Sequence, residues 1–135
     1  MTLVDSNVLL DLVTDDPDWA AWSLARLEEV ALAGPVLIND VIYGETSIRY
    51  SRIEDLDAML AEAKIELAPI PRPALFLAGK AFQQYRRAGG IRSGVSPDFF
   101  IGAHAAVEGW PLLTRDAGRY RGYFPKLTLI DPHGR

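Results

Sequence analysis

Four acidic residues stand where the sequence predicts that buried strands give way to helices or turns. Asp5 ends the apolar run at residues 1–4, and Asp116 follows the apolar run at residues 112–114. Asp98 falls in the first turn of a predicted helix, where the helix dipole favours an anion, and Glu45 lies about a turn and a half into another. Because ligands bind at the carboxyl ends of parallel strands, we expect these four carboxylates to meet at one sheet edge.

Carboxylates gathered in this way repel one another unless a cation joins them. An all-oxygen ligand set selects hard cations such as Mg²⁺ or Mn²⁺, which keep waters and bind few carboxylates directly. Such a cation can lower the pKa of a bound water and neutralise a phosphoryl oxygen. The predicted reaction is therefore the hydrolysis of a phosphodiester.

Each acid taken alone also has an ordinary interpretation. Asp98 could be a helix cap, Asp116 a solvated turn residue and Glu45 a surface charge. Asp5 is different, because an aspartate that directly ends a buried strand is costly without a partner. One shared site explains the four positions better than four independent coincidences.

Other catalytic chemistries find little support. His104 lies six positions after Asp98, on a different helix face, and is interpreted as a core histidine, while His133 is in the tail. The stretch at residues 94–98 lacks the second glycine of a G-x-S-x-G elbow, and the chain contains neither a P-loop nor a G-x-G-x-x-G motif. With no cysteine there is no thiolate chemistry, and nothing points outside the cytoplasm.

Short apolar runs that alternate with amphipathic segments must position the acids. The predicted strands are residues 1–4, 36–38, 65–67, 112–114 and 127–130. The predicted helices are residues 6–13, 18–33, a segment that begins at Asn39 or Asp40 and carries Glu45, and residues 53–64, 74–87 and 98–108. Strands that alternate with helices imply right-handed βαβ units. We therefore expect an α/β fold in three layers, α/β/α, around a central, mostly parallel, twisted sheet.

Composition indicates a soluble, single-domain protein over residues 1–135. The chain is 49% apolar and 24% charged, and no run approaches the length of a membrane span. Its net charge of −4 argues against a protein that wraps nucleic acid electrostatically, although a local basic rim remains compatible with it. The candidates for that rim, which could equally be ordinary solvated arginines, are Arg86, Arg87, Arg92, Arg115, Arg119 and Arg121. Arg115, beside Asp116, is the best of them for a substrate phosphate.

Trp19 and Trp22 lie on one amphipathic helix. Core packing is the ordinary interpretation, and an anchor pair for a partner helix is the alternative.

The chain resembles the PIN domain, and in particular the VapC-like toxins of bacterial toxin–antitoxin pairs, over essentially its whole length. The matching stretches are LVDSNVLL at 3–10, NDVIYGE at 39–45, PDFFIGAHA at 97–105 and LLTRD at 112–116, followed by the tail at 120–130. Any one stretch is a weak signal, but four in order are strong.

The resemblance implies a Mg²⁺- or Mn²⁺-dependent endoribonuclease that acts as a toxin. Asp5 and Asp98 match the most direct metal ligands, and Glu45 and Asp116 match positions that complete the site. Ser6 and Thr114 match hydroxyl positions that orient water or carboxylates. The implied partners are an RNA substrate, a cognate antitoxin whose C-terminal segment covers a groove and the acidic site, and a second copy of the chain in a homodimer.

Two alternatives remain open. One is a structure-specific DNA nuclease, which would use the same carboxylates, although a chain of this length has no helical arch insertion to thread a DNA flap. The other is a non-cleaving, metal-dependent nucleic-acid-binding module or receiver domain. A receiver would have adjacent acids after its first strand, where this chain has Asp5-Ser6-Asn7.

Overall fold

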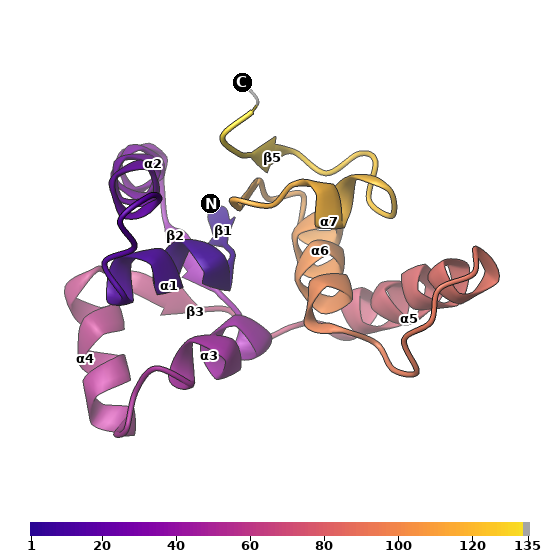
Figure 1. The fold of residues 1–135 in the computed structure, drawn as a ribbon, viewed down its shortest axis with the longest axis horizontal. Coiled ribbons are helices and arrows are strands. Elements are labelled where there is room, and N and C mark those ends of the chain that lie inside the picture. The colour runs from indigo at the N-terminus through magenta and orange to yellow at the C-terminus, as the bar shows by residue number, and fades with distance from the viewer. Residues whose placement is uncertain (134–135) are drawn as a thin grey trace.

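In the computed structural model, which describes residues 1–133, short strands form one parallel sheet in the order β3-β2-β1-β4-β5 (Figure 1). The strands are β1 (Thr2–Val4), β2 (Val36–Ile38), β3 (Ile65–Leu67), β4 (Leu112–Leu113) and β5 (Leu129–Ile130). Leu3 of the central strand pairs with Leu37 on one side and with Leu112 on the other. The predicted parallel sheet is confirmed, as is the three-layer α/β/α arrangement.

The chain builds the sheet outward from β1 to β3 and then returns to the other side of β1 with β4. Strand order therefore reverses between β1 and β4, and in open α/β sheets ligands bind in the crevice at such a point. The backbone amide of Asp5 donates to the carbonyl of Leu113 over 2.9 Å, which extends the pairing of β1 and β4 to the end of both strands. The residues after these two strands thus share one edge.

Helices cover both faces of the sheet. They are α1 (Ser6–Val13), α2 (Ala20–Ala33), α3 (Asp40–Ser47), α4 (Ile53–Glu62), α5 (Arg72–Arg87), α6 (Pro97–Glu108) and α7 (Gly118–Arg121). In Figure 1, α1 to α4 lie on one side of the picture and α5 to α7 on the other. None of the helices within residues 1–133 combines the length and the apolar character that crossing a membrane demands.

Several predicted boundaries differ from the structure by one or two residues; for example, α4 ends at residue 62 rather than 64, and α5 begins at residue 72 rather than 74. The second helix begins at Ala20 rather than Asp18, because the Asp16 carboxylate accepts hydrogen bonds from the amides of Asp18 and Trp19 (2.8 and 3.0 Å) and forms a turn there. The helix α7 was not predicted at all. With four residues it is too short to show an apolar period.

The helix α6 is central, as its apolar sequence predicts, and Ile101 and Ala103 are fully buried in it. Gly102 allows α6 to touch the segment that follows it, since a Cβ at this position would lie 2.5 Å from the Phe124 ring and 3.0 Å from the Tyr120 ring. This close approach carries Tyr120, on α7, to the edge of the sheet where Asp5 lies.

Asn39 fixes the start of α3 against α6. Its Oδ1 accepts from the amide of Ile42 over 2.9 Å, which is a regular N-cap, and its Nδ2 lies 3.1 Å from Nδ1 of His104. The His104 side chain is fully buried, so the prediction of a core histidine is confirmed. Burial lowers the pKa of His104 and keeps the ring neutral.

Candidate functional site

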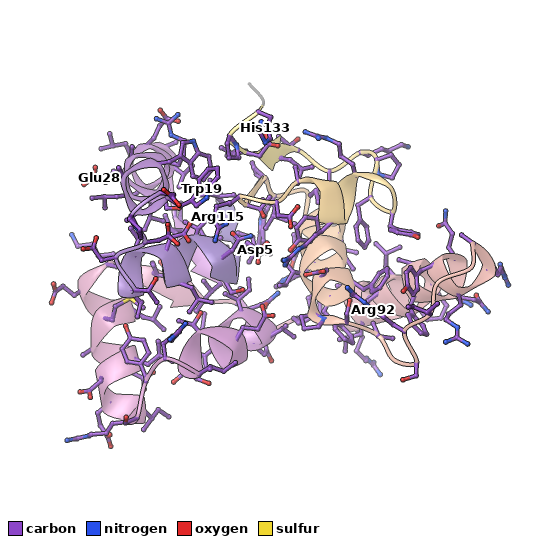
Figure 2. The ribbon with its side chains drawn as sticks, viewed as in Figure 1. Asp5, Trp19, Glu28, Arg92, Arg115 and His133 are labelled. Atoms are coloured by element: carbon purple, nitrogen blue, oxygen red, sulfur yellow. The ribbon has the colours of Figure 1, made fainter. Side chains whose placement is uncertain are left out.

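Asp5 occupies the centre of the molecule, between α1 and α6 (Figure 2). It follows β1, precedes α1 and is only 2% exposed. Its Oδ2 accepts hydrogen bonds from Oγ1 of Thr114 (2.9 Å) and from the Tyr120 hydroxyl (2.6 Å). Within residues 1–133 no lysine or arginine pairs with it. A buried carboxylate is therefore held by neutral donors alone; Arg119 is close enough to interact with its charge but makes no ion pair with it.

Tyr120 was not predicted as a site residue. Burial, and then the nearby charge of Asp5, raise the pKa of Tyr120 far above its usual value, so its hydroxyl stays protonated and donates. The tail at residues 120–130, which resembles the family, begins at Tyr120, but the four-residue helix α7 has no periodic pattern that would show which way this side chain points.

Ser6 joins Asp5 to Glu45. Its Oγ donates to Oε1 of Glu45 over 2.8 Å and lies 3.5 Å from Oδ1 of Asp5. Burial is the main cause that raises the pKa of Glu45; the Ser6 hydrogen bond lowers it, and repulsion from Asp5 and Asp98 raises it again. The structure thus brings Glu45, on α3, within electrostatic range of the carboxylates that follow β1 and begin α6.

Asp98 and Asp116 share one cation, the guanidinium of Arg119 on α7. Nε of Arg119 lies 2.7 Å from Oδ2 of Asp116, and its Nη1 lies 3.6 Å from Oδ1 of Asp98. Burial raises the pKa of Asp98, Arg119 lowers it, and repulsion from Asp5 and Asp116 raises it further. All four predicted acids therefore lie at one edge of the sheet, with Arg119 as the counter-ion for two of them.

Arg115 does not point to these carboxylates. Its Nε and Nη2 each lie 2.9 Å from an oxygen of Asp11, which is 2% exposed and also accepts from Ser23 over 2.8 Å. The guanidinium lies 5.2 Å from the Trp19 ring centre, beside it in Figure 2. Arg115 thus ties the loop after β4 to α1 and α2. Its predicted contact with a substrate phosphate stays a prediction.

Of the other arginines of the predicted rim, Arg87 is exposed in the last turn of α5, and the remaining four divide into two groups. Arg119 and Arg92 act on the carboxylates, since both lower the pKa of Asp98. Arg121 instead pairs with Asp131 over 3.3 Å, and Arg86 donates to the carbonyl of Arg92 over 2.6 Å. The basic rim around the acids therefore consists mainly of Arg92 and Arg119.

The donor set fits a hard divalent cation. Carboxylate and hydroxyl oxygens are the ligands that Mg²⁺ and Mn²⁺ prefer, and these ions keep waters in place of further protein ligands. In the part of the chain that the structure describes, no three acidic or histidine side chains are close enough to enclose a metal by themselves. A cation here would thus be bound by few carboxylates directly, and it would supply the opposite charge that no ion pair gives to Asp5.

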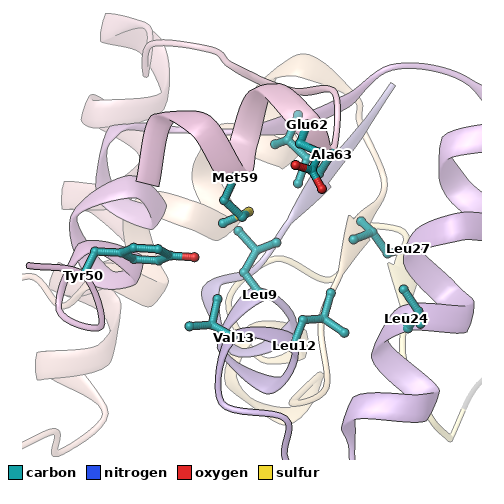
Figure 3. A pocket seen from close by; sticks show the side chains of 10 residues that line it. Leu9, Leu12, Val13, Leu24, Leu27, Tyr50, Met59, Glu62 and Ala63 are labelled. Atoms are coloured by element: carbon teal, nitrogen blue, oxygen red, sulfur yellow. The ribbon is translucent and has the colours of Figure 1, made fainter. Parts of the chain in front are cut away.

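A second feature is an apolar groove of about 410 Å³ between α1, α2 and α4 (Figure 3). Figure 3 shows Leu9 and Leu12 from α1 facing Leu24 and Leu27 from α2, with Met59 from α4 closing one end. Trp19 and Trp22 do not line this groove. They pack edge to face, with 6.0 Å between ring centres, and Trp22 packs against the core.

The sequence matches the PIN domain family over residues 2–124. No curated protein sequence matches the chain. Among solved structures, VapBC2 from Rickettsia felis, bound to a DNA fragment from its promoter, superposes with a TM-score of 0.72 at 18% identity, over 96% of this chain and 97% of that chain. VapBC-1 from nontypeable Haemophilus influenzae gives 0.70 at 15% identity, over 96% of each chain. A toxin–antitoxin complex from Klebsiella pneumoniae gives 0.65 at 19% identity, over 100% of each.

Proposed function

This chain belongs to the PIN domain family, and on that premise we propose that it is a Mg²⁺- or Mn²⁺-dependent endoribonuclease, the toxin of a toxin–antitoxin pair. The observation that carries the proposal is Asp5: a buried carboxylate at the point where strand order reverses, with no ion-pair partner among the described residues and with three more acids nearby. Buried charges in proteins are as a rule paired with an opposite charge or coordinate a metal.

Asp5 and Asp98 would hold the metal directly, and Glu45 and Asp116 would complete the site, in part through water. A bound divalent cation supplies a water of lowered pKa and neutralises charge on a phosphoryl oxygen. The protein supplies the positioning. Thr114 and Tyr120 occupy Oδ2 of Asp5, so that Oδ1 is the oxygen on the side of Ser6 and Glu45.

The toxin assignment rests on the groove and on the solved structures that resemble this chain. Two of those structures are VapBC complexes and one is named a toxin–antitoxin complex. We propose that an amphipathic helix of the cognate antitoxin occupies the groove between α1, α2 and α4. Leu24, which is 47% exposed on its rim, is the best-placed anchor, in place of the two tryptophans.

We also propose that the protein acts in the cytoplasm and forms a homodimer. Leu75 and Phe76 on α5, 43% and 70% exposed, offer an apolar face for a second copy. Light scattering should give the mass of a dimer for the purified protein, and the mass of a monomer for Phe76→Ser.

The test of the enzymatic proposal is an incubation of purified protein with total RNA, with and without Mn²⁺ or Mg²⁺, followed by mapping of the cut ends. Asp5→Asn and Asp98→Asn keep the side-chain shape, remove one charge and should abolish cleavage while the fold persists. Asp55→Asn, an exposed carboxylate on α4, is the matched control and should cleave like the wild type.

Duplex and single-stranded DNA in parallel reactions separate the RNA proposal from the DNA-nuclease alternative. Cleavage that persists in EDTA, or in both asparagine variants, contradicts the metal mechanism. Metal binding without any cleavage supports the non-cleaving module instead.

A further inference from the structure

We propose that a small cavity beside the carboxylates binds one unpaired nucleobase of the RNA, next to the phosphate that is cut; this inference rests on the proposed function. The cavity measures about 230 Å³ and is lined by side chains from α5, from the start of α6 and from α7 with the residues after it. It shares Asp98 and Arg119 with the acidic site, so the two are continuous.

The size of the cavity limits what it can hold. Pockets for drug-sized ligands measure roughly 300–1,000 Å³, and this one is smaller. It accommodates a single planar heterocycle rather than a folded segment of chain.

The walls of the cavity are aromatic. Tyr85, Phe99 and Tyr123 lie with ring centres 5.6 to 6.3 Å apart, each pair edge to face. Phe99 is buried, while the two tyrosines are half-buried and line the cavity. Aromatic side chains of this kind are the platforms on which single-stranded nucleic acids stack their bases.

The loop over these rings is held in place. The Tyr85 hydroxyl accepts from the backbone amides of Ile91 and Arg92 (3.1 and 3.2 Å). Gly90 packs directly on the Tyr85 ring, where a larger residue would collide. The cavity is therefore bounded by a fixed ring and a loop anchored to it, and Arg92 is carried to its rim.

One polar atom in the wall has no partner. Ser96 occupies the N-cap position of α6, where serine usually accepts from the first turn, yet its Oγ makes no capping bond. Among the described residues this buried hydroxyl has no hydrogen-bond partner, and Ser96 is one of the residues that line the cavity. A base edge carries the donors and acceptors that would satisfy it, which an apolar ligand would not.

The charges around the cavity suit a nucleotide rather than a free aromatic molecule. Arg92 and Arg119 stand on its rim, and both act on Asp98. A base stacked against this aromatic wall would thus leave its phosphate beside the arginines and the acids. Since paired bases are stacked and unavailable, the site selects unpaired loops or single strands.

The test compares two RNA hairpins with the same stem, one with an intact loop and one whose loop positions are all abasic. We expect wild-type protein with Mn²⁺ to cut the intact loop with kcat/KM about tenfold or more above the abasic loop, the effect of one stacked base. Tyr123→Leu should reduce this ratio to near one, and Tyr123→Phe should preserve it. Tyr43→Leu, a tyrosine on α3 outside the cavity, is the matched control and should keep the ratio.

A second experiment tests the role of the Ser96 hydroxyl. With loops of only adenosine, cytidine, guanosine or uridine, Ser96→Ala should change the order of preference while the intact-to-abasic ratio stays high. Thermal melts confirm that each variant is folded.

Binding of the same two hairpins to wild-type protein in EDTA, measured by fluorescence anisotropy, decides the base site independently of catalysis. If neither RNA is cut but the intact loop binds more tightly, the proposed nuclease fails and the base site stands. If the wild type cuts and binds both hairpins equally, or if Tyr123→Leu lowers both rates by the same factor, the cavity is not a base site.

Discussion

Replacing Arg119 by glutamine should strengthen metal binding and weaken RNA binding at the same time. Arg119 is the only cation that the structure, over residues 1–133, places within ion-pair distance of the acidic cluster, at 2.7 Å from Asp116 and 3.6 Å from Asp98. A divalent cation on these carboxylates must either displace the guanidinium or share the site with it. Both alternatives reduce the affinity of the wild type for metal.

The size of the effect follows from the geometry. Arg119 is 50% exposed, so the ion pairs that a metal would displace are worth about 0.2–1 kcal/mol each. If the guanidinium stays, like charges about 4 Å apart in bulk water repel by about 1 kcal/mol per unit-charge pair, and a divalent ion somewhat farther away gives the same order. Either route predicts that Arg119→Gln tightens Mn²⁺ binding about fivefold.

The same substitution should destabilise the metal-free protein, because Asp98 and Asp116 lose their counter-ion. A loss of about 1 kcal/mol corresponds to a melting temperature lower by about 4 °C in a chain of this size. Excess Mn²⁺ should then raise the melting temperature more in the variant than in the wild type, by mass action. RNA binding should weaken, and its salt dependence should fall by about one phosphate contact.

Isothermal titration with Mn²⁺ measures the metal affinity, and thermal melts in EDTA and in Mn²⁺ measure the stability. Fluorescence anisotropy with labelled RNA measures RNA binding. Arg121→Gln is the matched control, because it removes the same charge from the same helix. Arg121 pairs with Asp131 and not with the acidic cluster, so the metal affinity of this variant should match that of the wild type. Weaker or unchanged Mn²⁺ binding in Arg119→Gln would refute the idea that Arg119 and the metal compete for the same carboxylates.

Three further predictions test the electrostatics, the packing and the groove. Burial and repulsion between acids raise the pKa of Glu45 and of Asp98, so the folded state holds protons that the unfolded state has released. Urea titrations in EDTA should therefore show that the free energy of unfolding rises as pH falls from about 7 to about 5, and that it rises less in Asp98→Asn. A steady loss of stability over this range would contradict the prediction. Arg115→Ala leaves the buried Asp11 unpaired and should lower the free energy of unfolding by about 3 kcal/mol. Adding Asp11→Ala should recover part of this loss, whereas fully additive losses would show that the two residues are not coupled. Leu24→Glu should weaken binding of the co-purified antitoxin more than tenfold with an unchanged melting temperature, since Leu24 is 47% exposed; an unaffected complex would place the antitoxin elsewhere.

The local pattern of the sequence was sufficient to predict the sheet and most helices. Strand β2 and helix α1 were predicted with the bounds that the structure has. Short apolar runs between amphipathic segments determine such elements through burial, which the sequence records directly. The approach of the four acids to one edge followed from the same pattern. Asp5 and Asp116 come after the parallel strands β1 and β4, Glu45 lies on the helix after β2, and Asp98 begins the helix that leads back to β4.

Contacts that depend on long-range geometry could not be predicted in this way. Arg115 stands beside Asp116 in sequence, yet its guanidinium pairs with Asp11, 104 positions away. A bidentate partner that is buried outweighs a solvated neighbour, since the buried Asp11 would otherwise carry an unpaired charge. Arg119 and Tyr120 reach the acids only because α7, a helix without a detectable period, packs on Gly102 of α6.

The acidic site therefore contains two kinds of carboxylate, which differ in how the protein holds them. Asp5 is fixed by hydroxyl donors from Thr114 and Tyr120, which orient it without neutralising its charge. Asp98 and Asp116 are neutralised by Arg119, a half-exposed side chain that can leave. An incoming cation would find one ligand already oriented and unneutralised, and two whose counter-ion could turn toward a phosphate. On the proposed function, metal binding and RNA binding would thus be coupled through the same guanidinium, because an ion that released Arg119 from the acids would also make it available to a phosphate of the RNA.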